Sequence, residues 1–279
     1  MGGEGVPLRY TLTLQYAVYK NVYISMRENL GNRILIFLIL VSAGILMSEA
    51  MEKEEIKYVV SYKWGLIQKD AGDARITKMP KDGGYELKLI ASTKPWADRI
   101  YKMRDTLISM VGLHKHLPIK YTRLAHEKNK YSRDEIIFTH SGTHSQGKGI
   151  KYREKKDGSV YQKDIEVEGL APAYDILSIF FYIRDLDFDS LKPSETVKTS
   201  IFSGDQSEKL TLYCKGKETI KLKDKTEAEA WHVVFKFTSK GGTKSSDDID
   251  CWISADERRI PLLIIASLPV GQIRCNYEP

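Results

Sequence analysis

The sequence lacks the short motifs that identify most nucleotide-dependent and redox enzymes. It has no complete Walker loop, no dinucleotide-binding glycine pattern, no Cys-x-x-Cys pair and no Gly-x-Ser-x-Gly nucleophile turn. These absences argue against ATP-driven and dithiol chemistry, and they leave no catalytic residue and no cofactor to assign. A non-enzymatic role is therefore the leading expectation, with an enzyme as the alternative.

Cysteine is scarce. The three cysteines, Cys214, Cys251 and Cys275, permit at most one intramolecular disulfide and leave one thiol over. Three small buried residues on strands are an equally supported interpretation.

No apolar run reaches the length of a typical membrane-spanning helix. The longest stretch, residues 34–47, would rise about 21 Å as a helix, short of the roughly 30 Å of hydrocarbon in a bilayer. Arg27 and Arg33 precede it, and Ser48-Glu49-Ala50 offers the small residues of a cleavage site. We predict a leader over residues 1–50 that is removed after Ala50. A retained anchor is the alternative, and Met26 is a more ordinary start than Met1.

A leader of this kind predicts an exported protein in the periplasm or cell envelope of a Gram-negative bacterium. Membrane contact is expected only through the leader before cleavage. Residues 51–279 then form a single β-rich domain, a normal size for one substantial core.

Charge is nearly balanced, with 43 Lys and Arg against 37 Asp and Glu. Lysines alternate with acids along predicted strands instead of forming a basic helix or patch, so a nucleic-acid partner is not expected.

Period-two alternation dominates the mature chain. In residues 56–64 the residues Ile56, Tyr58 and Val60 share one face, and Asp157-Gly158 marks a hairpin between alternating runs. Helical spacings predict helices over residues 95–112 and 171–184. The expected fold is mainly β, a curved antiparallel sheet forming an incomplete barrel or β-roll with two helices; a β-sandwich is the alternative.

Two groups of residues suggest metal sites without completing one. The first group is five of the six histidines, His114, His116, His126, His140 and His144, and no carboxylate or cysteine spacing completes a ligand set. Asp185, Asp187 and Asp189 begin like a calcium loop, but Ser190 and Thr196 stand where glycine and glutamate are needed. No metal site is assigned.

Several separate segments of the mature chain resemble the exported bacterial proteins grouped as domain of unknown function family 3108. They are Tyr62-Lys63-Trp64-Gly65, Asp70-Ala71-Gly72, Arg104-Asp105-Thr106, Leu117-Pro118 with Tyr121, Tyr174 to Ser178, Phe181 to Arg184 with Asp187-Phe188, Tyr213, Gly216-Lys217-Glu218, Trp252 to Asp256, Ile260-Pro261-Leu262 and Gly271. Cys214 and the extended N-terminus depart from the pattern. The resemblance implies an exported, mainly β protein and supplies no active site.

Fold-level analogy with half-open envelope barrels that shield lipid gives the first functional hypothesis. A non-enzymatic protein would bind an apolar or amphipathic envelope ligand, lipid included, or assist envelope assembly. The expected ligand-binding residues near the mouth of the sheet are Tyr174, Phe181, Tyr182, Arg184 and Trp252.

Two alternatives stay open. A hydrolase acting on envelope glycans or esters would need convergent ionisable groups, and Asp185, Asp187 and His232 are its candidates. A structural module would pair an exposed strand edge with an envelope protein.

Overall fold

Strands with one apolar face cannot stand alone, and here they join into one continuous sheet. The computed structural model describes residues 53–192, 195–239 and 248–279, so the predicted leader lies outside the described residues. The first limb contains β1 (Glu54–Trp64), β2 (Ile67–Lys81), β3 (Gly84–Thr93), β4 (Met103–Gly112), β5 (Pro118–Glu127), β6 (Lys130–Ser141), β7 (His144–Glu154) and β8 (Val160–Leu170). The second contains β9 (Ala173–Tyr174), β10 (Thr196–Ser203), β11 (Gln206–Lys221), β12 (Glu227–Ser239), β13 (Ile249–Ser254), β14 (Pro261–Ser267) and β15 (Gln272–Glu278).

Each limb is a meander, and the two limbs join where the first strand meets the last. β1 pairs antiparallel with β15, so the order runs from β8 back to β1 and on through β15 to β9. Every pairing is antiparallel except that of β9 with β10. The edge strands of the sheet are therefore β8 and β9.

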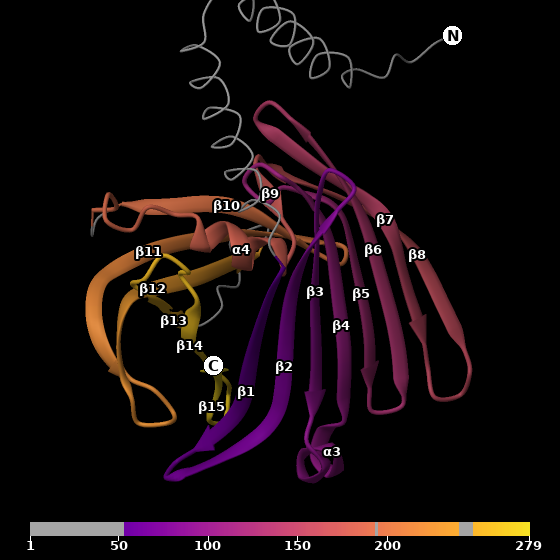
Figure 1. Cartoon of the computed structure of the whole chain (residues 1–279). Coiled ribbons are helices and arrows are strands. Elements are labelled where there is room, and N and C mark those ends of the chain that lie inside the picture. Colours follow the sequence, from indigo (N-terminus) through magenta and orange to yellow (C-terminus); the bar gives the residue numbers. More distant parts are fainter. Residues whose placement is uncertain (1–52, 193–194, 240–247) are drawn as a thin grey trace, which may run out of the picture. The chain divides into compact units, whose positions relative to one another are not determined.

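The sheet curves until its two ends meet without sealing (Figure 1). β8 contacts β10 and β11 but has no hydrogen-bonded ladder with either strand. The result is a nearly closed, barrel-like sheet with one unsealed seam, which confirms the predicted incomplete barrel over the sandwich. Within the described part of the chain, no helix is long and apolar enough to cross a membrane.

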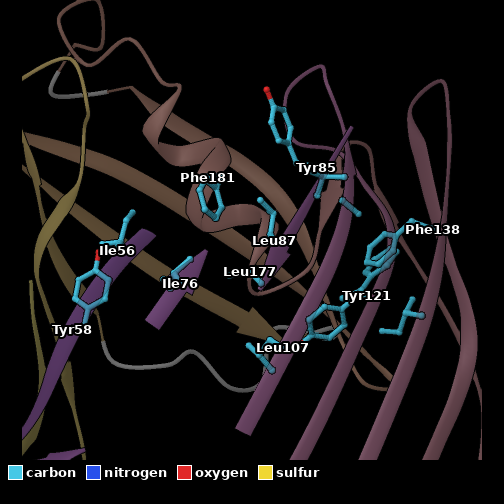
Figure 2. Close-up of a cluster of buried hydrophobic side chains, with 14 of the residues drawn as sticks. Ile56, Tyr58, Ile76, Tyr85, Leu87, Leu107, Tyr121, Phe138, Leu177 and Phe181 are labelled. Atoms are coloured by element: carbon cyan, nitrogen blue, oxygen red, sulfur yellow. The ribbon is translucent and has the colours of Figure 1, made fainter. Parts of the chain in front are cut away.

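The helix α4 (Ser178–Arg184) lies inside the curve and packs against both limbs. Leu177 and Phe181 join the core cluster of the first limb, together with Leu87 (Figure 2). Ile179 and Ile183, on another side of the helix, join the cluster built on β10 to β13. One short helix thus joins two apolar surfaces that would otherwise face each other across the barrel.

The helix prediction over residues 95–112 is wrong for most of its length. The helix α3 (Pro95–Tyr101) is followed by β4, which pairs with β3 and β5. Leu107, Ser109 and Val111 are buried at every second position, the spacing of a strand. The predicted helix over residues 171–184 is correct only for α4, because Ala173 and Tyr174 form β9.

The three cysteines are free thiols in one row across the second limb. Cys214 pairs with Val233, which pairs with Cys251, and Ile264 lies between Cys251 and Cys275. Neighbouring cysteines are thus two strands apart, about 9.6 Å. A disulfide requires Cα atoms within roughly 7 Å, so this register excludes the bridge that the sequence allowed.

Candidate functional site

The seam between the two ends of the sheet contains a groove of about 380 Å³. Its lining comes from three segments, namely Gln146, Gly147 and Lys148 of β7, Glu166, Val167 and Glu168 of β8, and Asp205 and Ser207 beside the β10–β11 turn. Lys148 and Glu166 are exposed, whereas Gly147 is buried and Val167 packs against the core. The groove therefore leads from the surface of the sheet toward its interior.

Two glycines bring core side chains to the bottom of this groove. A Cβ on Gly147 would lie 2.8 Å from Ile136 and Val167 side-chain atoms and 3.0 Å from Phe202. A Cβ on Gly169 would lie 2.6 Å from Ser200 Oγ. Because glycine has no side chain, β10 can pack directly on β7 and β8, and the groove combines polar walls with an apolar floor.

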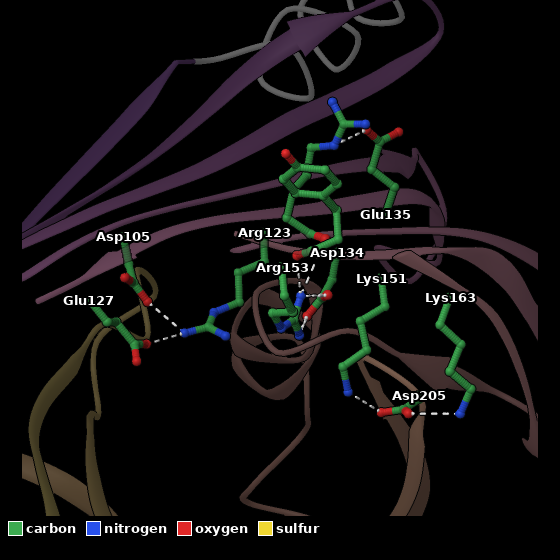
Figure 3. Close-up of polar contacts among 11 residues, drawn as sticks. Asp105, Arg123, Glu127, Asp134, Glu135, Lys151, Arg153, Lys163 and Asp205 are labelled. Carbon is green, nitrogen blue, oxygen red and sulfur yellow. Dashed lines mark hydrogen bonds and ion pairs between the residues drawn. The ribbon is translucent and has the colours of Figure 1, made fainter. Parts of the chain in front are cut away.

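Asp205 holds the β10–β11 turn against the first limb. Lys151 Nζ donates to Asp205 Oδ1 at 2.6 Å, and Lys163 Nζ lies 3.4 Å from Oδ2 (Figure 3). The hydrogen bond from Lys151 holds the pKa of Asp205 below its usual 3.8, against a smaller opposing effect of burial. Gly204 precedes it with φ of 58°, a conformation that glycine adopts without strain in a tight hairpin turn.

The concave face beside this turn is lined by further ion pairs (Figure 3). Arg123 donates to Asp105 at 3.0 Å and to Glu127 at 2.7 Å. Arg153 binds Asp134 with two hydrogen bonds, one of them 2.9 Å long. Strands β4 to β7 are thus apolar near α4 and polar toward their other end.

Four of the five residues expected to bind ligand lie on or beside α4. Tyr174 and Phe181 are buried, and the rings of Tyr174 and Tyr182 stack at 4.6 Å. Arg184 binds Glu54 through two hydrogen bonds of 2.6 and 2.9 Å and donates to the carbonyls of Arg258 and Arg259. The structure brings these four residues together, and their contacts attach α4 to the surrounding strands. None of them lines the seam groove.

Trp252, the fifth residue expected to bind ligand, lies apart from α4 and makes other contacts. Its indole stacks on His232 at 4.4 Å and donates to Glu218 at 2.5 Å. His232 also lies 2.6 Å from Asp250. Trp252 alternates along β13 with the buried Cys251 and Ile253, so it faces away from the core that contains α4.

The candidate hydrolase residues do not converge. Asp185 contacts His116, Asp187 accepts a hydrogen bond from Ser190, and His232 contacts Glu218 and Asp250. Among the described residues, no group of three or more His, Cys, Asp or Glu side chains is arranged to hold a metal ion.

One polar chain at the rim of the sheet was missed by sequence reasoning. Lys78 Nζ lies 2.9 Å from His116 Nε2, and His116 Nδ1 lies 2.8 Å from Asp185 Oδ2. A protonated lysine only donates, so Nε2 accepts and the Nδ1–H donates to the carboxylate. Burial lowers the pKa of Lys78, partly offset by the carboxylate of Asp185. This series of polar contacts connects β2 to the C-terminal end of α4.

A second missed contact anchors the other end of α4. The fully buried Asp175 accepts hydrogen bonds from Ser109 Oγ at 2.7 Å and from the backbone N–H groups of Leu177 and Ser178. Burial raises the pKa of Asp175 in spite of these donors. Ser109 and Asp175 are far apart in sequence, so no local pattern could have paired them.

Comparison with protein-family models identifies the chain. The model described as "Protein of unknown function (DUF3108)" matches residues 57–276, which is most of the sequence and almost all of the described sheet. The chain belongs to the DUF3108 family. The resemblance drawn from the separate segments of the sequence is thereby confirmed at the level of the family. No curated protein matches the chain significantly.

A solved structure resembles the fold of this DUF3108 protein. It is the crystal structure of a "Beta-barrel-like Protein of Domain of Unknown Function DUF1849" from Brucella abortus, with a TM-score of 0.53 and 10% sequence identity. The alignment covers 82% of this chain and 96% of that one. At this identity the likeness shows a shared barrel-like fold.

Proposed function

We propose that this protein is exported to the cell envelope and binds an amphipathic envelope ligand, a lipid or lipid-like molecule, in the seam groove. The observation that carries the proposal is the composition of the groove, which has polar walls and also Gly147 and Val167, beside the core residues Ile136 and Phe202. Its volume of about 380 Å³ lies within the range of small-molecule sites. Export rests on the leader of the sequence.

The polar lining of the groove favours one kind of polar group. Its carboxylates include Asp205, which is paired with Lys151 and Lys163, and Glu166, which is paired with Lys148, so charge there is largely compensated. Gln146 and Ser207 add neutral hydrogen-bonding groups. A ligand with a hydroxyl-rich polar part and an apolar chain fits this lining, with the chain directed toward Val167.

Titration with lysophosphatidylethanolamine tests the proposal, because this probe combines a polar head group and a free glycerol hydroxyl with one acyl chain. Gln146→Trp places a bulky side chain at the exposed wall of the groove and should abolish binding. Thr139→Trp is the matched control, since Thr139 pairs with Gln146 on the adjacent strand, is also exposed and does not line the groove. Equal binding by both variants and the unmodified chain would contradict the groove as the site.

A second candidate function follows from the edge of β8. Within the described residues, β8 is hydrogen-bonded only to β7, so the backbone of its other edge faces the seam. An extended segment of an envelope protein could add to this edge as a strand. Glu166 and Glu168 alternate with apolar residues along β8, the kind of charge that limits indiscriminate strand pairing. Crosslinking in cells from Gln162→Cys, which lies on this strand, would recover one dominant envelope protein if this candidate is correct.

A further inference from the structure

Two neighbouring turns at one end of the sheet present apolar side chains to solvent. We call this surface the apolar tip and define it as Trp64, Leu66, Ile67, Leu268 and Val270. Leu66 is 105% exposed, and Trp64 and Val270 are each 59% exposed. Trp64 ends β1, Leu66 lies in the β1–β2 turn and Ile67 begins β2, whereas Leu268 and Val270 lie in the β14–β15 turn.

The two turns are held together by backbone packing, so the tip is a built surface. Lys63 pairs with Gln272, and Tyr62 donates a hydrogen bond to Val270 O at 2.8 Å. Gly271 has a φ of 78°, and a Cβ there would lie 2.4 Å from Lys63 O. Any larger residue at position 271 would separate the turns. The apolar side chains of the tip are therefore held in contact with solvent and not packed into the core.

Cations border the apolar tip. Residues 61–69 and 264–273 contain lysines at positions 63 and 69 and no acidic residue. Lys69 lies 4.3 Å above the ring of Trp96 on α3. Residues 94–102 contain Lys94, Arg99 and Lys102 and one acid, Asp98, which is paired with Arg104; Lys94 lies 3.2 Å from Asp73.

Past α3, Lys128 adds a further cation next to Glu127, which accepts a hydrogen bond from Tyr101 at 2.6 Å and is paired with Arg123. Lys128 N donates to Lys102 O at 2.8 Å, and the Lys128 ammonium lies 5.1 Å from the ring of Tyr101. Ile100, on the same helix, is 73% exposed. Apolar side chains bordered by lysine and arginine are the combination by which proteins bind the surface of anionic bilayers.

We propose that the apolar tip inserts into the surface of a bilayer containing anionic phospholipid, with the lysines of β2 and α3 contacting the head groups. This contact is additional to the leader that the sequence predicts. It does not depend on ligand binding in the seam groove, because no residue of the tip lines that groove. The charge of the border selects anionic lipid over a second copy of this chain, which would bring like charges together.

A local fluorescent probe tests the proposal in the full chain. Leu66→Cys labelled with an environment-sensitive nitrobenzoxadiazole group is mixed with vesicles of phosphatidylglycerol and phosphatidylcholine in equal parts, or of phosphatidylcholine alone. Ser141→Cys, exposed on the β6–β7 turn at the other end of the sheet, is the matched control. The leader is common to both proteins, so the difference between the two labels reports the tip itself.

The expected result is a rise in fluorescence at position 66 with anionic vesicles only, a smaller rise in high salt and no change at position 141. Lys69→Glu with Lys102→Glu should weaken the apparent affinity about tenfold or more, since each basic residue contributes roughly 1 kcal/mol near an anionic surface. Equal responses at both positions, or an equal response to both vesicles, would overturn the proposal. A rise at position 66 with protein concentration alone would identify self-association and overturn it as well.

Discussion

Asp205→Asn tests whether the contact across the seam is a real element of stability. The substitution keeps the size of the side chain and removes the charge that Lys151 and Lys163 contact. A hydrogen bond to a charged group contributes about 1.5–3 kcal/mol when well shielded. The side chains of Asp205 and Lys151 are 26% and 25% exposed, so solvent reduces this, and we expect a loss of about 1–1.5 kcal/mol.

Urea unfolding of the single and double variants measures the contribution of each lysine. The cycle with Lys151→Met should give a coupling energy of about 1 kcal/mol, and the cycle with Lys163→Met less than about 0.5 kcal/mol, because that ammonium is 54% exposed and 3.4 Å away. The fall in Tm expected for Asp205→Asn is roughly 2–6 °C for a domain of this size.

The contribution of Asp205 to the free energy of unfolding depends on pH in a defined way. Because the folded pKa of Asp205 is depressed, its contribution is fully present above the unfolded value near 3.8 and is lost as the pH falls through the folded value. The stability difference between wild type and Asp205→Asn should therefore be constant down to about pH 4 and shrink below it. Equal coupling to both lysines, or a stability difference that does not shrink as the pH falls below about 4, would contradict this role of Asp205.

Three further predictions concern α4, the seam and the thiols. Arg184→Met should lower the free energy of unfolding by about 3 kcal/mol, because four hydrogen bonds of a largely buried guanidinium are lost; a loss below about 1 kcal/mol in urea titration would show that α4 is held by its apolar contacts alone. Gly169→Ala should cost about 1–3 kcal/mol in the same assay and Gly112→Ala less than about 1 kcal/mol, since a Cβ on Gly112 meets nothing nearer than 4.0 Å; similar costs would argue against close packing at the seam. Burial raises the pKa of Cys251 and raises that of Cys275 to about 11, so all three thiols should resist Ellman's reagent until the protein unfolds, and rapid reaction of the folded protein would contradict their placement.

Sequence periodicity predicts much of the fold. The main error of that prediction, the helix over residues 95–112, has a physical cause. Met103, Leu107 and Met110 satisfy a helical spacing, while Leu107, Ser109 and Val111 satisfy a strand spacing over the same residues. Pairing with β3 and β5 decides between them, and that pairing is a tertiary effect.

The groove was harder to predict than the strands, because its walls come from three segments separated by about 20 to 40 residues each. The signal present in the sequence was glycine inside strands, Gly147 and Gly169, which marks close approach of another backbone or side chain. Contacts such as Arg184 with Glu54, separated by 130 positions, leave no local pattern at all.

Native mass spectrometry of protein recovered from cell envelopes in mild detergent tests most directly whether the seam groove binds the proposed amphipathic envelope ligand. Wild type and Thr139→Trp should carry the same small-molecule adduct, and Gln146→Trp should carry none. An adduct retained by Gln146→Trp, or a wild-type spectrum of the bare chain alone, would contradict the account.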